Sequence, residues 1–418
     1  MDSIVVHGGR PLAGEVTVSG AKNSALTILA AALLAPGEHT IGGLPALRDI
    51  STMIKLLEHL GAEVSGLEEL KIDTGSIHTF EAPYDLVRTM RASFLVLGPL
   101  LARFGSARVS LPGGCAIGVR PVDIHIRGLE AMGAHISIEQ GYVNASCPRL
   151  KGARILFDMP TVGGTENIMM AACLARGTTT IENAAREPEV VELARALKHM
   201  GAIISGEGTA TMVIEGVDEL HPGSYTVMPD RIEAGTLLVA AGITGGDITI
   251  RNCPVQIMGS TVKKLREAGI TIEEGCNVLR ARSNGRLSPV EVITSPHPGF
   301  PTDMQAQIMA LLTLADGTSI IRETIFENRF IHVAELDRMG ANIKVEHDTA
   351  VVVGVDGLEG AAVMATDLRA SASLILAGLA ARGRTVVSRV YHLDRGYDRL
   401  EKKLQGLGAD VYREKKNE

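Results

Sequence analysis

The sequence predicts an α/β protein with two domains, each built from three repeated units. Three observations lead to this prediction. The chain has 418 residues, more than the roughly 250–300 that a single hydrophobic core usually serves. Ala/Leu-rich segments of helical character alternate with β-branched segments of strand length. One short phrase recurs six times along the chain, at intervals of 68 to 72 residues.

The recurring phrase joins the end of an amphipathic helix, a glycine and the start of a β-branched strand. Its glycines are Gly61, Gly133, Gly201, Gly269, Gly340 and Gly408. A second pattern recurs with the same period: an Ala/Leu-rich helix that ends in glycine. Glycine is the residue that best fits a left-handed helix C-terminus. Each unit is therefore expected to run helix, strand, loop, amphipathic helix, strand. A period of about 70 residues is too long for a solenoid, so six units give two domains with internal pseudo-threefold symmetry.

Charge and composition limit the classes of partner. The formal net charge is −7 and the pI is about 6.0, which disfavours a broad nucleic-acid-binding surface. The longest apolar run in a predicted helix, Ala25–Ala35, is too short to cross a bilayer, and the first residues lack the pattern of a signal peptide. We therefore expect a cytoplasmic protein with no nucleic-acid or membrane partner.

The cysteines indicate neither a disulfide framework nor a metal site, because they are odd in number and widely separated, without a Cys-x-x-Cys pair. They are Cys115, Cys147, Cys173, Cys253 and Cys276. The sequence thus predicts no metal and no cofactor.

Basic side chains stand at the predicted N-terminal ends of four apolar helices. They are Lys22, Arg91, Arg231 and Arg369. A helix N-terminus is already positive, so a cation there is favourable where an anion binds and neutralises both. Arginines in glycine-containing loops, Arg120, Arg329 and Arg395, are typical of a phosphate cage. The alternative is a set of ordinary ion pairs, of Arg395 with Asp394 or Asp398 and of Arg329 with Glu327.

Asp303 follows Pro301 and Thr302 and opens a predicted helix. An aspartate at this place is an ordinary helix cap. It is also a candidate general base, provided that it lies within hydrogen-bond reach of a substrate hydroxyl.

Cys115 lies in the segment LPGGCAIGVRP, residues 111–121, whose glycines and lack of apolar periodicity predict an exposed loop. Free cysteines are usually buried and inert, an interpretation that fits Cys173 in its apolar helix. A thiol in an exposed loop risks oxidation, so its presence there points to a use, and Arg120 could tune its pKa. Both a general acid and a nucleophile remain open.

Six motifs together resemble a known family. They are GAKNSAL (20–26), LPGGCAIGVRPVDIH (111–125), FPTDMQAQ (300–307), TIFENRF (324–330), DLRASASLILAG (367–378) and HLDRGYDRLEKKL (392–404). On these motifs, which spread over all six units, the chain resembles the UDP-N-acetylglucosamine 1-carboxyvinyltransferases, a family of enolpyruvyl transferases. The resemblance implies a two-domain inverted α/β barrel like that of EPSP synthase. It also implies a discontinuous first domain (1–21 plus 229–418), a second domain (22–228) with a mobile loop at 111–121, and an active site in the cleft between them.

The reaction that the resemblance implies is the first committed step of peptidoglycan biosynthesis. The enolpyruvyl group of phosphoenolpyruvate is transferred to the 3'-hydroxyl of UDP-N-acetylglucosamine by addition and elimination, and phosphate is released. These two small molecules are the expected partners, with no cofactor, in a monomer or weak homo-oligomer. The antibiotic fosfomycin is expected to alkylate the loop cysteine.

The resemblance also implies roles for individual residues. Cys115 is the general acid, with a possible covalent adduct, and Asp303 is the general base. Lys22, Arg120 and Arg395 hold phosphoenolpyruvate, while Asp367 and Arg369 form a polar pair near the reacting centre. The expected sugar-nucleotide contacts are Asn23, Arg91, Arg120, Pro121, Val122, Asp123, Ile124, Thr161, Val162, Gly163 and Ile325. Met159 stands where some members carry lysine, which puts a diphosphate contact there in doubt.

Two other functions fit parts of the pattern. An EPSP synthase uses the same chemistry on shikimate 3-phosphate, but that family has no cysteine loop like residues 111–121. A catalytically silent paralogue would bind the sugar nucleotide and regulate the pathway, yet the expected catalytic residues are all present. Acceptor choice separates the first from our interpretation, and turnover separates the second.

Overall fold

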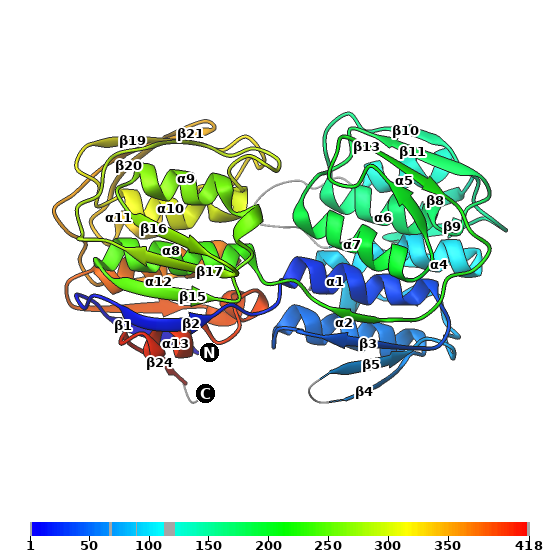
Figure 1. Ribbon diagram of the computed structural model, residues 1–418, viewed down its shortest axis with the longest axis horizontal. Helices are drawn as coiled ribbons and strands as arrows, with labels where there is room; N and C mark the ends of the chain where they lie inside the picture. Colours follow the sequence, from blue (N-terminus) through cyan, green and yellow to red (C-terminus); the bar gives the residue numbers. More distant parts are fainter. Residues whose placement is uncertain (1, 67–68, 89, 113–121, 416–418) are drawn as a thin grey trace. The chain divides into compact units, whose positions relative to one another are not determined.

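The structure, a computed structural model, describes residues 2–66, 69–88, 90–112 and 122–415 (Figure 1). Its contacts divide these residues into two compact units. Unit 1 contains the residues up to Ser19 and those from Pro229 onward, and unit 2 contains the described residues from Gly20 to Met228. Each unit has its own hydrophobic core. Because aromatic residues make up only 3% of the chain, these cores consist mainly of Ala, Val, Ile, Leu and Met.

Short strands form the walls of both units. In unit 1 they are β1 (Ser3–His7), β2 (Ala13–Thr17), β15 (Asp247–Arg251), β16 (Thr271–Gly275), β17 (Val278–Arg282), β18 (Glu291–Ile293), β19 (Thr318–Arg322), β20 (Asn342–Glu346), β21 (Thr349–Val353), β22 (Ala362–Met364), β23 (Arg384–Ser388) and β24 (Asp410–Glu414). In unit 2 they are β3 (Glu38–Gly42), β4 (Glu63–Ser65), β5 (Leu70–Asp73), β6 (Glu81–Ala82), β7 (Ser106–Ser110), β8 (His135–Glu139), β9 (Tyr142–Ser146), β10 (Arg154–Leu156), β11 (Thr178–Glu182), β12 (Ile203–Ser205), β13 (Thr211–Glu215) and β14 (Ser224–Thr226).

Within the described ranges these strands make six four-stranded sheets, three in each unit. The orders are β22-β23-β1-β24, β16-β17-β15-β2 and β18-β19-β21-β20 in unit 1, and β14-β3-β5-β4, β6-β7-β9-β8 and β10-β11-β13-β12 in unit 2. In every sheet one edge pair is parallel and the other two pairs are antiparallel. This common pattern confirms the predicted α/β fold of six repeated units.

The prediction of two strands per unit was wrong, because each sheet has four. The strand after the repeat glycine folds back as a hairpin in most units, as β16 does onto β17. The parallel edge strand is only two to five residues long, too short to stand out in the sequence. In the last unit β24 pairs with β1 instead of a following strand, with Ser3 opposite Glu414. The first strand of the chain thus completes the sheet that the last strand begins.

Each unit encloses three central helices, which are buried on almost every side (Figure 1). They are α8 (Arg231–Thr244), α10 (Gln305–Leu312) and α12 (Leu368–Ala380) in unit 1, and α1 (Lys22–Ala31), α4 (Leu97–Phe104) and α6 (Val162–Ala172) in unit 2. The three in unit 1 all pack against one another. Helices that are apolar all round belong in a core, and these are the Ala/Leu-rich segments of the sequence.

The remaining helices are outer or short. The outer helices are α2 (Arg48–Leu60), α5 (Asp123–Ala131), α7 (Pro188–His199), α9 (Gly259–Glu267), α11 (Val333–Asp337) and α13 (Leu400–Gly406). The short helices are η1 (Ala32–Leu34), α3 (Tyr84–Val87), η2 (Arg91–Val96), η3 (Val255–Ile257), η4 (Thr302–Met304) and η5 (Val390–Arg395). None of the described helices has both the length and the apolar character that a bilayer span requires.

The repeat glycines have a common backbone role. Their φ angles are 109, 91, 106, 94, 90 and 92° in chain order. Side chains with a β-carbon rarely adopt this left-handed region, so glycine recurs where each amphipathic helix must turn into a strand. The left-handed C-caps predicted for the central helices occur directly at Gly105 after α4 and at Gly245 after α8.

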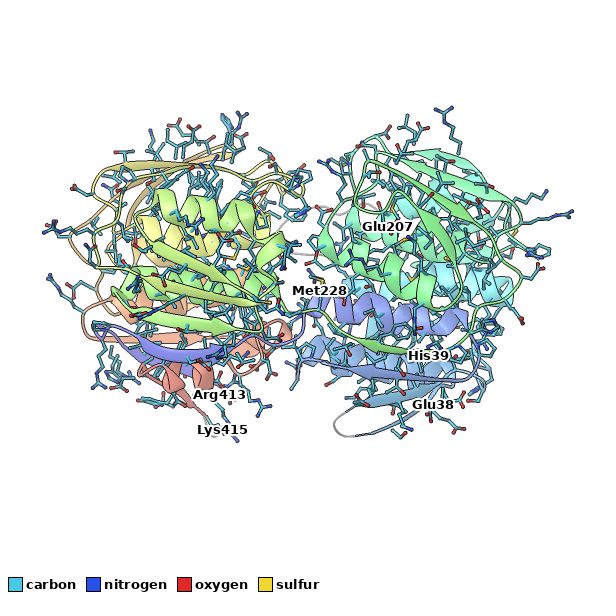
Figure 2. The ribbon with its side chains drawn as sticks, in the orientation of Figure 1. Glu38, His39, Glu207, Met228, Arg413 and Lys415 are labelled. Carbon is cyan, nitrogen blue, oxygen red and sulfur yellow. The ribbon has the colours of Figure 1, made fainter. Side chains whose placement is uncertain are left out.

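A buried or half-buried glutamate anchors the residue before each chain crossing between the units. In unit 1 the Ser19 N–H donates to Glu233 at 2.8 Å. In unit 2 the N–H of Met228, labelled in Figure 2, donates to Glu192 at 2.7 Å. The last residue before each crossing, Ser19 or Met228, is therefore hydrogen-bonded to a glutamate of its own unit.

Candidate functional site

The predicted site residues cluster at the N-terminal ends of the central helices. In unit 1 Asp303 lies in η4, directly before α10, while Asp367 and Arg369 lie at the start of α12. In unit 2 Lys22 and Asn23 begin α1, Arg91 begins η2, and Thr161 stands before α6. We call these two groups the unit-1 half-site and the unit-2 half-site. Three predicted residues, Cys115, Arg120 and Pro121, lie outside the described residues.

Asp303 is bound by two buried arginines. Its Oδ1 accepts a hydrogen bond from Arg329 Nη2 at 2.8 Å, and its Oδ2 accepts one from Arg369 Nη2 at 2.7 Å. The arginine side chains are only 5% and 4% exposed. Burial by itself would raise the pKa of Asp303, but the charges of Arg369 and Arg329 outweigh burial and hold that pKa well below its usual range. Asp303 is therefore ionised at neutral pH.

The interpretation of Asp303 as a helix cap was wrong. Met304 occupies the cap position of α10, and no side chain forms a cap hydrogen bond there. The expected ion pair of Arg329 with Glu327 is likewise replaced by the pair with Asp303. Asp303 and Arg329 therefore place their charges in the unit-1 half-site. Neither a helix cap nor a local ion pair with Glu327 accounts for them.

The two arginines keep spare hydrogen-bond donors. Within the described residues, Arg369 Nε and Nη1 and Arg329 Nη1 are buried without a hydrogen-bond partner. Buried donors are rarely left unsatisfied in native proteins, and charged ones least of all. An anionic ligand with several oxygens would satisfy them. The unit-1 half-site is thus equipped for an anion beside an ionised carboxylate.

Asp367 fixes the start of the helix that carries Arg369. Its Oδ1 accepts hydrogen bonds from the N–H groups of Arg369 at 2.8 Å and Ala370 at 3.1 Å. The guanidinium of Arg369 also lies over the Tyr397 ring, 5.4 Å from its centre. Arg395, the last residue of η5, is partly buried. Asp394, one of its expected partners, is bound by Arg413 at 3.0 Å.

His125 lies close to two members of the unit-2 half-site, Arg91 and the turn at Gly163. Its Nδ1 lies 3.0 Å from Asn167 Nδ2, and its ring packs edge-on against Phe94. Burial and the nearby charge of Arg91 lower the pKa of His125 to about 4, so the ring is neutral and Nδ1 accepts the hydrogen bond. A β-carbon at Gly163 would lie 3.4 Å from His125 Cε1, so the glycine backbone borders the ring.

The starts of α5 and α6 also meet in this half-site. Thr161 caps α6 by accepting a hydrogen bond from Gly164 N at 3.2 Å. A β-carbon at Gly164 would lie 3.3 Å from the Ile124 side chain. The predicted segments 122–124 and 161–163 are therefore neighbours in space. Asp123 is exposed and pairs with Arg127, and Met159 is 58% exposed, with no charge to offer a diphosphate.

Lys22 is the first residue of α1. Its Nζ lies 3.3 Å from Asp49 Oδ2, and the two side chains are 12% and 5% exposed. Asn23 is exposed, and the next residue, Ser24, donates its hydroxyl hydrogen to the Glu192 carboxylate. Sequence reasoning missed Asp49, Glu192 and His125. The two carboxylates have no signature in their spacing, whereas His125 ends a motif quoted above and could have been noticed.

The carboxylate of Glu192 has an unusual protonation equilibrium. Burial raises the pKa of Glu192 to about 7, although the hydrogen bond from Met228 acts in the opposite direction. On the same helix Glu189 raises and Arg195 lowers this pKa. The folded chain therefore holds a proton on Glu192 that the unfolded chain releases near its ordinary pKa of 4.5.

The substitution Glu192→Gln is expected to flatten the pH dependence of stability. The stability that the protonated carboxyl contributes is fully present below the unfolded pKa of 4.5 and is lost as the pH rises through about 7. Melting curves at about pH 5 and about pH 8 should show the variant gaining roughly 2–4 °C over the wild type at the higher pH.

Glu207→Gln is the matched control for this prediction. Glu207, labelled in Figure 2, is a glutamate of the same unit, and its hydrogen bond with Lys198 lowers its pKa. The stability from a lowered pKa is fully present above the ordinary value of 4.5 and is lost only as the pH falls below it, so this variant should differ from the wild type by the same amount at about pH 5 and about pH 8. A Glu192→Gln difference that is equal at both pH values contradicts the assignment.

Comparisons with known proteins show the family to which the chain belongs. The profile of the EPSP synthase (3-phosphoshikimate 1-carboxyvinyltransferase) family matches residues 6–404. A UDP-N-acetylglucosamine 1-carboxyvinyltransferase of Geotalea uraniireducens (strain Rf4) is 61% identical over 414 residues, which cover 99% of each chain. A protein of the same name from Myxococcus xanthus (strain DK1622) is 59% identical over 419 residues, 99% of this chain and 100% of its own.

Two solved structures of known enzymes are similar to this chain in fold. The enolpyruvyl transferase NikO from Streptomyces tendae superposes with a TM-score of 0.89 at 28% identity, covering 99% of this chain and 98% of that chain. An EPSP synthase from Acinetobacter baumannii superposes with a TM-score of 0.77 at 18% identity, over 99% and 100% of the two chains. The second likeness concerns the fold alone, and it confirms the EPSP synthase-like architecture expected from the motifs.

Proposed function

This chain belongs to the EPSP synthase family, and we propose that its two half-sites carry out one enolpyruvyl transfer. The enzyme transfers the enolpyruvyl group of phosphoenolpyruvate to the 3'-hydroxyl of UDP-N-acetylglucosamine and releases phosphate. This transfer is a step of peptidoglycan biosynthesis. The observation that carries the assignment of roles is the ionised Asp303 between two buried arginines with spare donors.

The reaction has two steps whose bonds balance. In the addition, C3 of phosphoenolpyruvate gains a proton while the sugar oxygen bonds to C2 and loses its own proton. In the elimination, C3 loses a proton, the carbon–oxygen bond to phosphate breaks, and the double bond forms again. The chain must therefore supply an acid at C3, a base at the sugar hydroxyl, and cations for the phosphate. Cys115 is our candidate for the acid and Asp303 for the base.

The low pKa of Asp303 bears directly on its role as a base. An aspartate bound by two arginines accepts a hydrogen bond readily but holds a proton poorly. Anionic oxygens of phosphoenolpyruvate would satisfy the spare donors of Arg329 and Arg369 and offset part of their charge. The pKa of Asp303 would then rise when the substrate is bound. Proton transfer from the sugar hydroxyl is in this way coupled to occupation of the site.

Phosphate and diphosphate groups fit the cationic residues and helix starts. We assign the phosphate of phosphoenolpyruvate to Lys22, Arg120 and Arg395, because an ammonium group and guanidinium groups both bind phosphate oxygens. The sugar nucleotide is assigned to Asn23, Arg91, residues 120–124, residues 161–163 and Ile325. The α6 N-terminus carries a partial positive charge, which favours a diphosphate.

The organisation around this chemistry follows from the same assignment. Lys22 and Asp303 belong to different units, so we propose that residues 1–21 plus 229–418 and residues 22–228 act as two domains on one pair of substrates. Both substrates are small molecules, and we propose a cytoplasmic monomer or weak homo-oligomer.

A phosphate-release assay with two alternative acceptors tests the function. We expect phosphate with phosphoenolpyruvate and UDP-N-acetylglucosamine, and only background with shikimate 3-phosphate, because the acceptor supplies the attacking hydroxyl. Release with shikimate 3-phosphate alone would identify an EPSP synthase. A folded sample that binds UDP-N-acetylglucosamine but releases no phosphate would favour the silent, regulatory function instead.

A further inference from the structure

One buried carboxylate in unit 1 joins several segments of the half-site. Glu323 directly follows β19 and is only 3% exposed. Its Oε1 accepts hydrogen bonds from the Thr294 hydroxyl at 3.0 Å, Ile325 N at 2.8 Å and Phe326 N at 3.1 Å. Its Oε2 accepts one from the Thr302 hydroxyl at 2.8 Å. Three of these bonds are made by Oε1 and one by Oε2, so both carboxylate oxygens are engaged.

The partners of Glu323 are the immediate neighbours of the reacting groups. Thr302 precedes Asp303 in the chain and begins the same short helix, η4. Ile325 is an expected contact of the sugar nucleotide. Oε2 therefore holds the residue before Asp303, the candidate base, and Oε1 holds the turn at Ile325, the expected acceptor contact.

The turn at Ile325 also reaches the arginine beside the base. Phe326, the second backbone donor to Glu323, has its ring under the Arg329 guanidinium, 5.1 Å from the ring centre. Arg329 in turn donates to Asp303. Two paths thus lead from one carboxylate to Asp303, one through Thr302 and one through the Phe326 ring.

Thr294 strengthens this arrangement from the neighbouring strand end. Thr324 N donates to Thr294 Oγ1 at 2.9 Å, and the Thr324 hydroxyl donates to Thr294 O at 2.6 Å. The residue between the strand and the turn is therefore held at its backbone and its side chain.

We propose that Glu323 is a positioning residue for the transfer reaction, which sets Asp303 and the turn at Ile325 in register with each other. This inference rests on the proposed function, because both targets are residues of that reaction. Glu323 does not touch the substrates in this scheme. It acts through Thr302 on the base and through the backbone at Ile325 on the acceptor.

The two arms of Glu323 predict separate kinetic effects. Thr302→Val removes the hydroxyl at nearly constant shape and is expected to lower kcat about 10-fold, with KM for UDP-N-acetylglucosamine within about threefold of the wild type. Thr302→Ser keeps the hydroxyl and should restore most of kcat. Glu323→Ala breaks both arms and should lower kcat and raise that KM together. Glu323→Gln should fall between Glu323→Ala and the wild type, because its amide oxygen still accepts from the two N–H groups.

Steady-state phosphate release and melting curves of the full chain test whether Glu323 is a positioning residue. Glu291→Gln, at an exposed position on β18, is the control and should leave both measurements unchanged. A merely structural role would lower the melting temperature and leave kcat and KM of the folded enzyme unchanged. Wild-type kcat in Thr302→Val overturns the proposal, and this variant stands even where Glu323→Ala does not fold. A wild type without turnover overturns the proposed function itself, and with it this inference, so the two failures are distinguishable.

Discussion

Replacing Asp303 with asparagine is expected to lower kcat about 1000-fold, in the range typical of the loss of a general base. The amide cannot accept the proton of the sugar hydroxyl, and it removes the only negative charge that the structure places within hydrogen-bond distance of both Arg329 and Arg369 in the described residues. Phosphate release under saturating substrates measures the effect. A variant within about threefold of wild-type kcat would remove Asp303 from the role of base.

The same substitution should also destabilise the protein by about 3 kcal/mol, because removing one partner of a buried ion pair leaves charge uncompensated. Urea unfolding measures this loss. Asp348→Asn is the matched control, an aspartate of the same unit that binds Arg322 at 2.9 Å with both side chains about half exposed. An exposed pair contributes roughly 0–1 kcal/mol, so the control should stay close to the wild type in stability and in kcat.

Replacing Cys115 with serine is expected to lower turnover by about 100-fold or more, since a hydroxyl is a much weaker acid than a thiol whose ordinary pKa is about 8.5. The affinity for UDP-N-acetylglucosamine, measured by calorimetry, should remain within about twofold, because the proposed function has the thiol act on phosphoenolpyruvate and not on the sugar nucleotide. Cys115 lies outside the described residues, so this prediction comes from the sequence and the resemblance. Unchanged turnover would end its assignment as the acid.

The other cysteines provide an internal control for this assignment. Fosfomycin should add to Cys115 and inactivate the enzyme, as peptide mass spectrometry would show. Burial raises the pKa of Cys173 and of Cys253 to about 12, so these thiols should stay unmodified. Cys276 is exposed and is the real competitor. Inactivation that follows an adduct at Cys276 would contradict the role given to Cys115.

The repeat predicted the fold well because it records a backbone requirement. A left-handed turn at Gly61 and its equivalents leaves glycine in the sequence wherever the turn occurs. The parallel edge strands, in contrast, have no recognisable sequence pattern. β6, for example, has two residues, and such a strand depends on the strand beside it rather than on its own sequence.

The candidate site was only partly predictable, for a related reason. Motifs made Asp303, Arg369 and Lys22 candidates, and the structure shows that Thr161 and Asp367 are helix caps. The partners Asp49 and Glu323 escaped, because a buried carboxylate is recognised by what the folded chain places around it. The two arginines that bind Asp303 could not be predicted either, since they lie 26 and 66 positions away in the sequence.

The pairing of β1 with β23 and β24 has a consequence for the order of events during synthesis. Among the described strands, β1 is made first and is an interior strand of its sheet, whereas its two partners, β23 and β24, are made last. The described residues of unit 2, by contrast, all lie between Gly20 and Met228, so they are synthesised before β23 and β24, the partners of β1. Domains generally fold as units when their residues are available.

In a circularly permuted gene that began at Pro229 and joined β24 to β1 by a short linker, unit 1 would become one uninterrupted segment followed by unit 2. The permuted and natural chains would share their contacts and differ in which unit the ribosome completes first.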